Sequence, residues 1–227
     1  ELRKKMPPWE EIKDDPPEGG LLRDDFPYEN QFFNELTVEP DLITFVQRVL
    51  GTQHIHFRYA HNWTRYPNGP KEHRLHRDNG NNSLLPFSED LREFGQIGFW
   101  IRLEDVDEDQ APLRLIPQKY GLDMTKCVPL VCAGGTLCIF TNFTQHSASA
   151  YTRKDGQRFT WGYSFGRSDH YWEGFRHYTH LGNAAPVFQE FIGGLTAKQR
   201  ELWRFPPTGH PYYTEQALAL LEAQYPG

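Results

Sequence analysis

Short apolar segments separated by polar stretches dominate the middle of the chain. They are rich in aromatic and β-branched side chains, are separated by Gly, Pro, Asn and Asp, and span residues 54–63, 97–103, 113–117, 136–141 and 157–165. Because successive side chains of a strand point to opposite faces, Ile97, Phe99, Ile101 and Leu103 are predicted to share one face that packs inward. Several short strands without intervening helices favour a sandwich or jelly roll over a parallel sheet.

A helical pattern precedes this β-rich region. Leu42, Val46 and Val49 recur at helical spacing, so a helix is predicted over residues 40 to 50. Asp41 is expected to cap its beginning and Gly51 to end it.

Helical patterns return near the end of the chain. One helix is expected to begin at Asn183 and to end at Gly193. Another should begin with a capping box formed by Thr196 and Gln199, and a final amphipathic helix should carry Leu221.

The 227 residues suit one large domain, 1–227, with appendages. Residues 1–37 are expected to form an N-terminal arm, because residues 1–20 are charged, rich in Pro and Gly, and typical of a loop rather than a core element. Residues 38–165 should then form a helix plus a jelly-roll core, and residues 166–227 C-terminal loops and helices.

Composition excludes several kinds of partner. The net charge of −6 provides no basic surface for nucleic acid. No apolar run approaches the roughly 20 residues that span a membrane. The three cysteines form no CxxC pair and are odd in number, so we expect them to be reduced and mostly buried, which favours a cytoplasmic protein.

The polar stretch "HRLHRDNGN", residues 73–81, contains a candidate metal-binding pair. His76 and Asp78 stand two positions apart and would project from the same face of a strand. With a second histidine they would form the two-histidine, one-carboxylate arrangement that suits non-haem Fe(II), because it leaves coordination positions open. His73 has Leu75 two places later and lacks a matching acid. An HxD triplet alone is weak evidence for a metal.

The sequence downstream offers the rest of such a site. The strand 136–141 leads into a short polar turn that ends at His146, and a later strand carries Arg158 and Thr160 on one face. A guanidinium beside a hydroxyl can hold a carboxylate by a bidentate contact. This set would bind a 2-oxo acid through the metal at one end and through Arg158 at the other. The alternative is that Arg158 is a surface arginine beside the turn "RKDGQR".

The segment from Val38 to Phe165 resembles the phytanoyl-CoA dioxygenase family of Fe(II)/2-oxoglutarate oxygenases. The residues that carry the resemblance are His76-Arg77-Asp78, Trp100 with Leu103 and Asp105, the turn from Ala111 to Tyr120, His146 and Arg158. Two departures stand out: "PQKY" replaces the usual Pro-Gly-Ser-His, and Ser147-Ala148 follows the distal histidine where Gly-Ser is frequent.

The resemblance implies a double-stranded β-helix, or jelly roll, that forms a single oxygenase domain. It implies Fe(II) held by His76, Asp78 and His146, and 2-oxoglutarate as a cosubstrate anchored by Arg158. Thr160 as a second anchor follows from strand alternation alone. The expected activity is a dioxygenase that uses O2 to hydroxylate an unactivated C–H bond of a small organic molecule. Related halogenases carry a small residue in place of the acid, so Asp78 argues against halogenation.

Two other readings stay open. A jelly roll could bind a metal or a small ligand without turnover, since fold does not determine function. A cupin-type hydrolase or isomerase ranks lower, because such sites usually contain more histidines and a Glu.

The sequence leaves the substrate open. In the segment 54–63, the odd-numbered residues from Ile55 to Trp63 would share one face and the even-numbered residues from His54 to Asn62 the other. One of these faces is expected to line the barrel.

Overall fold

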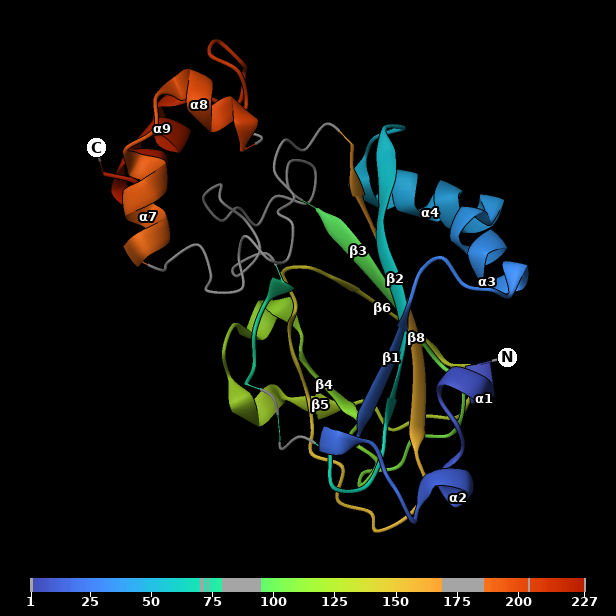
Figure 1. Ribbon diagram of the computed structural model, residues 1–227. Coiled ribbons are helices and arrows are strands. Elements are labelled where there is room, and N and C mark those ends of the chain that lie inside the picture. The colour runs from blue at the N-terminus through green and yellow to red at the C-terminus, as the bar shows by residue number, and fades with distance from the viewer. Residues whose placement is uncertain are drawn as a thin grey trace.

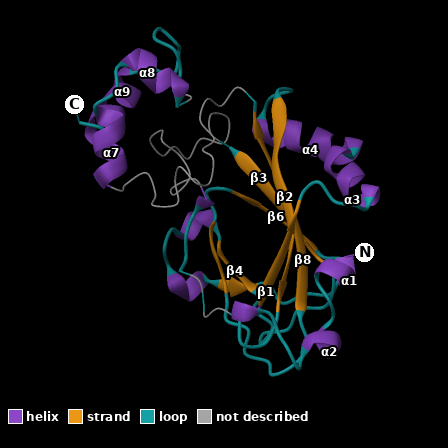
Figure 2. Ribbon diagram, viewed as in Figure 1, coloured by secondary structure: helices purple, strands orange, loops and turns teal. Residues whose placement is uncertain are grey.

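The computed structural model describes residues 2–69, 72, 74–78, 95–168, 186–203 and 205–226. Within these residues, two antiparallel sheets form the centre of the fold (Figures 1 and 2). The larger sheet has the order β1 (Leu21–Asp25), β2 (Ile55–Arg65), β8 (Arg158–Arg167), β3 (Gln96–Arg102) and β6 (Leu137–Thr141). The smaller sheet has the order β5 (Val128–Pro129), β4 (Leu113–Ile116) and β7 (Gln145–Ala148).

Helices from the N-terminal and C-terminal parts of the chain flank the sheets. They are α1 (Leu2–Lys5), α2 (Trp9–Ile12), α3 (Gln31–Glu35), α4 (Pro40–Leu50), α7 (Pro186–Gly193), α8 (Ala197–Leu202) and α9 (Glu215–Gln224). Short 3-10 turns lie at Glu18–Gly20, Leu36–Val38, Gln118–Tyr120 and Met124–Lys126. The prediction of a mainly β protein with flanking helices is confirmed.

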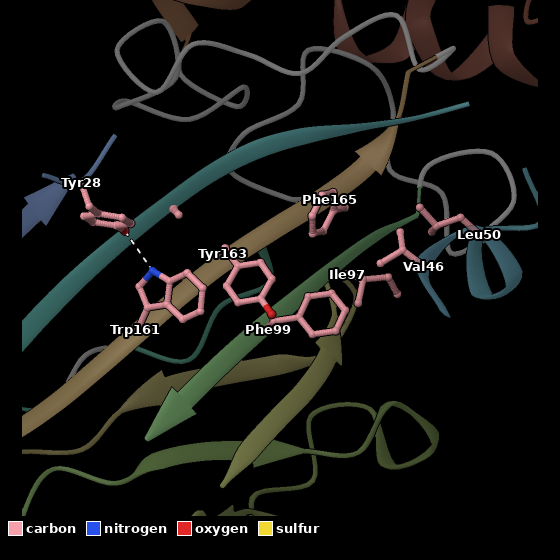
Figure 3. Close-up of a cluster of buried hydrophobic side chains, with 9 residues drawn as sticks. Tyr28, Val46, Leu50, Ile97, Phe99, Trp161, Tyr163 and Phe165 are labelled. Carbon is pink, nitrogen blue, oxygen red and sulfur yellow. Dashed lines mark hydrogen bonds between the residues drawn. The ribbon is translucent and has the colours of Figure 1, made fainter. Parts of the chain in front are cut away.

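An aromatic core joins the larger sheet to α4 (Figure 3). Phe99 of β3 and Tyr163 of β8 stack with ring centroids 5.1 Å apart, and the Trp161 indole N–H donates a 3.1 Å hydrogen bond to the Tyr28 hydroxyl. We call this helix-covered side the outer face of the sheet, and the opposite side the inner face. The outer face is the buried surface that the alternation predicted for Ile97, Phe99 and Ile101. The prediction is wrong for Leu103, which lies beyond the end of β3 and is 38% exposed.

Helix α4 is held at both ends by local interactions. The expectation that Asp41 caps it is wrong, because the Glu39 carboxylate accepts from the backbone N–H groups of Asp41 and Leu42 at 2.7 and 3.1 Å. A longer side chain one residue before Pro40 can reach back over the first turn. Gly51 ends the helix as predicted, in the left-handed conformation with φ of 67°.

The N-terminal arm contributes to the core, contrary to expectation. Residues 21–25 form strand β1, which pairs with β2. Met6 and Trp9 are only 1% and 8% exposed. The Thr64 hydroxyl donates to the Met6 sulfur at 2.9 Å, and the Tyr66 hydroxyl donates to the Pro7 carbonyl at 2.6 Å. Few apolar residues suffice here because the arm needs to cover only one end of the sheet.

Strand β2 changes face part-way along its length. Its register with β8 shifts between Phe57 and Tyr59, so Phe57 pairs with Phe165 on the outer face, whereas Tyr59 pairs with Ser164 on the inner face. The expectation that the odd-numbered residues of this strand share one face is therefore wrong. A bulge inserts one extra residue and inverts the alternation beyond it.

The C-terminal helices pack around Phe143, which lies between β6 and β7. This second cluster contains Phe143, Ile192, Phe205, Leu221 and Tyr225. The capping box of Thr196 and Gln199 is confirmed. Asn183 lies outside the described residues.

The three cysteines are free, but only Cys138 is buried, so the expectation that most of them are buried is wrong. Within the described ranges, none of the helices combines the length and the apolar character that crossing a bilayer requires.

Candidate functional site

Two histidines far apart in the sequence meet through a short antiparallel bridge. The His76 backbone N–H donates to the His146 carbonyl at 3.0 Å, and the His146 N–H donates to the His76 carbonyl at 2.9 Å. Directly opposed residues of antiparallel strands project to the same side. The two imidazole centroids consequently lie 4.5 Å apart.

Asp78 completes a cluster of three metal-binding side chains. Its Oδ1 atom lies 3.6 Å from His146 Nε2 and 3.9 Å from His76 Nε2. These separations exceed hydrogen-bond length but are smaller than twice a metal–ligand bond of about 2.1 Å. Within the described residues, these three form a group whose ligand atoms all lie within 4.8 Å of one another.

The local structure around the HxD triplet differs from the expectation. His76 forms an isolated bridge to His146, and Asp78 has a helical backbone conformation instead of continuing a strand. His146, expected at the end of a turn, lies within β7, where it also faces Leu115 of β4. His73 lies outside the described residues.

The outer ring nitrogens of both histidines are already engaged. His76 Nδ1 lies 2.9 Å from the Arg74 carbonyl, and His146 Nδ1 lies 2.9 Å from the Thr144 carbonyl. A carbonyl only accepts hydrogen bonds, so in the neutral form of each ring Nδ1 carries the proton and Nε2 the lone pair. Both lone-pair nitrogens face Asp78, which is the arrangement seen when backbone carbonyls orient metal-binding histidines.

Burial favours the metal-binding form of His146. The side chain lies between Trp100 and Phe140, with centroid distances of 6.3 and 5.0 Å. Burial lowers the pKa of His146, and the negative charge of Asp78 acts in the opposite direction. The neutral imidazole, which is the form that binds metal, is therefore favoured.

Two tryptophans form the wall next to His146. Trp63 and Trp100 meet edge to face at 4.6 Å, above Gly162 of β8. A Cβ atom on Gly162 would lie 2.8 Å from the Trp63 ring, so the glycine is needed for this close approach.

Arg158 and Thr160 lie on the inner face of β8 and are 1% and 0% exposed. The alternative of a surface arginine is therefore wrong. The Arg158 guanidinium donates through Nη1 to the carbonyl of Ala111. Thr160 accepts a 2.5 Å hydrogen bond from Nη1 of Arg102, which stands opposite it on β3.

Arg102 is a buried polar residue of this wall that the sequence analysis did not single out. It is 0% exposed, and its guanidinium lies 5.8 Å from the Trp100 ring, which in turn contacts His146. Strand alternation could have identified Arg102 from the sequence. Because Ile97, Phe99 and Ile101 lie on the outer face, the alternate residues Trp100 and Arg102 must lie on the inner face.

Comparison with known proteins supports the fold. No family model matches the chain, and no curated protein sequence matches it. Solved structures do match. SnoK, described as a non-heme alpha ketoglutarate dependent carbocyclase from nogalamycin biosynthesis, aligns over 79% of both chains with a TM-score of 0.56 and 14% identity. The chain shares the fold of such enzymes.

Two further structures agree with this fold. SnoN, a non-heme alpha ketoglutarate dependent epimerase from the same biosynthesis, aligns over 66% of this chain with a TM-score of 0.51 and 15% identity. HygX from Streptomyces hygroscopicus, solved with nickel and 2-oxoglutarate bound, aligns over 69% of this chain and 74% of its own, with a TM-score of 0.50 and 14% identity. The chain spans less than two thirds of some matching structures, since it covers 62% of SnoN and 36% of a further matching protein, EvdMO1.

Proposed function

We propose that this protein is an Fe(II)/2-oxoglutarate-dependent dioxygenase with a jelly-roll core, related to the phytanoyl-CoA dioxygenase family. The observation that carries the proposal is the cluster of His76, Asp78 and His146, in which both histidines present a lone pair to the carboxylate. The nearness of three candidate ligands could arise by chance. The matching carbonyl contact behind each ring is a second, independent sign of a metal site.

The donor set fits a catalytic iron better than a structural metal. Two imidazoles and one carboxylate occupy one side of an ion and leave the other positions open, whereas structural zinc sites are closed by four protein ligands. The cluster is partly exposed at His76 and Asp78 and buried at His146. It is therefore open to ligands from one side and anchored in the protein on the other.

The inner face of the sheet beside the cluster fits a 2-oxo acid. Arg158 and Thr160 would hold the carboxylate far from the metal, since a guanidinium and a hydroxyl donate to an anion. Trp63, Trp100 and Phe140 would exclude water beside His146. HygX, which shares the fold, was solved with nickel and 2-oxoglutarate bound. When bound, iron would couple the oxidative decarboxylation of 2-oxoglutarate by O2 to oxidation of the substrate.

The reaction we propose is hydroxylation of an unactivated C–H bond in a small organic molecule. Asp78 supplies the carboxylate ligand that halogenases of similar type lack, which disfavours halogenation. The three free cysteines favour the reducing cytoplasm, where Fe(II) is retained.

Removing a ligand tests the proposal. Anaerobic addition of Fe(II) and 2-oxoglutarate to the wild type should produce a weak visible charge-transfer band, and admission of O2 should produce succinate. Asp78→Ala and His146→Ala should lose both signals, with iron affinity reduced more than the roughly 10- to 100-fold typical of outer-shell changes. His54→Ala is the matched control, because His54 is exposed at the start of β2.

The possible results separate the two readings of the site. Succinate formation that persists in Asp78→Ala or His146→Ala would overturn the ligand assignment. A wild type that binds iron but gives neither band nor succinate at saturating 2-oxoglutarate would favour a non-catalytic binding protein.

A further inference from the structure

Two buried guanidiniums lie side by side on the inner face of the larger sheet. Arg102 of β3 is the cross-strand partner of Thr160, and Arg158 stands two residues before Thr160 on β8. Both arginines are essentially fully buried, at 0% and 1% exposure. Two like charges are thus enclosed in a small region of the protein interior.

Among the described residues, the same edge of each guanidinium has no hydrogen-bond partner. Nη1 of Arg102 donates to Thr160, and Nη1 of Arg158 donates to the Ala111 carbonyl. The Nε and Nη2 atoms of both arginines are buried and have no partner among the described residues. Nε and Nη2 form the side of a guanidinium that donates two parallel hydrogen bonds to one carboxylate.

The described residues do not balance these charges with an ion pair. The negative charge of Glu104 acts on Arg158, and the Glu104 carboxylate accepts from the Phe159 N–H at 2.8 Å and from Gln157 Nε2 at 3.1 Å. Burial lowers the pKa of Arg102 to about 10, and burial together with the Arg102 charge lowers that of Arg158. Buried charges of one sign are costly until a counter-charge arrives.

Thr160 is oriented by the same contact. Its oxygen accepts from Arg102 at 2.5 Å, so its own O–H is left to donate elsewhere. A carboxylate offers about four lone-pair positions. One bidentate edge from each arginine would supply donors for these positions, and the Thr160 hydroxyl is an alternative donor on the same face.

We propose that Arg102 is a second carboxylate-binding arginine, which together with Arg158 selects dicarboxylic over monocarboxylic 2-oxo acids as the cosubstrate. This inference rests on the proposed function, because it concerns the far end of the 2-oxoglutarate pocket. A purely structural Arg102, which only braces Thr160, is the competing interpretation.

Cosubstrate selectivity separates these interpretations. With Fe(II) under anaerobic conditions, dissociation constants are measured for 2-oxoglutarate and for 2-oxobutyrate, which lacks the far carboxylate. In Arg102→Met the constant for 2-oxoglutarate should rise about 10- to 100-fold, while that for 2-oxobutyrate should change by less than about threefold. Arg102→Lys, which keeps the charge but loses the planar fork, should fall between the wild type and Arg102→Met.

Stability of the unliganded protein supplies a second readout. If Arg102 mainly binds the ligand, the melting temperature of Arg102→Met without ligand should be no lower than that of the wild type. Added 2-oxoglutarate should raise the melting temperature of Arg102→Met less than that of the wild type. A lower melting temperature with an unchanged ratio of the two dissociation constants would overturn the proposal. Arg153→Met is the control, because Arg153 lies in the β7–β8 loop and forms ion pairs with Asp107 and Asp109 of the β3–β4 loop.

A metal-free measurement distinguishes failure of this inference from failure of the proposed function. Glutarate has both carboxylates but no 2-oxo group, and the shift that it causes in melting temperature reports on the arginine pocket alone. Wild-type succinate formation with unchanged selectivity in both Arg102 variants would overturn only the role of Arg102. Absence of the charge-transfer band and of succinate in the wild type would overturn the proposed function. Even then, a melting-temperature shift caused by glutarate in the wild type and lost in Arg102→Met would support dicarboxylate binding by the arginines.

Discussion

The two faces of strands β3 and β8 are equally buried yet differ completely in chemistry. On the outer face, Phe99, Trp161 and Tyr163 pack against one another in the core covered by α4. On the inner face, the alternate residues include Arg102 and Arg158. The same ten-residue strand β8 therefore supplies an aromatic face and a polar face, depending only on whether a position is odd or even.

The contrast shows why burial alone does not identify a core. Burying aromatic side chains stabilises the folded protein. Burying guanidiniums costs them their hydration, and only a bound anion compensates for that loss. The outer face should thus contribute most of the stability of the sheet. The inner face should contribute little or even oppose folding until an anion is bound.

Removing an outer-face ring should have the largest effect on stability. Phe99 is fully buried and stacks on Tyr163, so Phe99→Ala should lower the free energy of unfolding by about 3–5 kcal/mol. Chemical denaturation measures this difference. Phe32→Ala is the control, because Phe32 is 60% exposed and its loss should cost about 0.5 kcal/mol or less. Equal losses in the two variants would contradict the assignment of the core.

Adding one carbon to the inner face should have an intermediate effect. In Gly162→Ala the new methyl group would lie 2.8 Å from Trp63 and 3.5 Å from Trp100, which should cost about 1–3 kcal/mol and weaken iron binding beside His146. Gly98→Ala is a matched control on the same face, since its nearest neighbour, Phe140, would be 3.7 Å away. Denaturation and iron titration of both variants test the prediction. Similar behaviour of the two would show that the tryptophan wall is not tightly packed.

Removing one hydroxyl from the outer face should have the smallest effect. Tyr28→Phe deletes the acceptor of the Trp161 indole N–H but keeps the ring, so the expected loss is about 0.5–1.5 kcal/mol. Iron affinity should stay unchanged, because this contact lies on the face opposite the metal cluster. The control is Tyr120→Phe, at a partly exposed position outside the sheets. A change in iron affinity in Tyr28→Phe would show that the two faces are coupled.

The sequence predicted the strands that are rich in apolar, aromatic and β-branched residues, and it missed β1, β5 and β7. The predicted strands correspond to β2, β3, β4, β6 and β8. Strand β7 reads Gln-His-Ser-Ala and is polar on both faces, so no period marks it. The bulge in β2 was also hidden, because the extra residue is visible only once β2 is paired with β8.

The candidate site shows the same division. The HxD triplet and the resemblance singled out His76, Asp78, His146 and Arg158 from the sequence. The expected geometry was wrong in one respect, since Asp78 has a helical backbone conformation and does not share a strand face with His76. Arg102 could have been found from the alternation of β3, had its apolar positions been assigned to the helix-covered side.

By itself, the sequence determined where most strands lie and which side chains could act as metal ligands, because strand alternation and ligand chemistry are local properties. Only the tertiary structure decided that His146 stands opposite His76 and that Arg102 shares a wall with Arg158. Those relations depend on the register between strands distant in sequence. Register is determined by backbone hydrogen bonds and by the packing of whole faces, which no local pattern specifies.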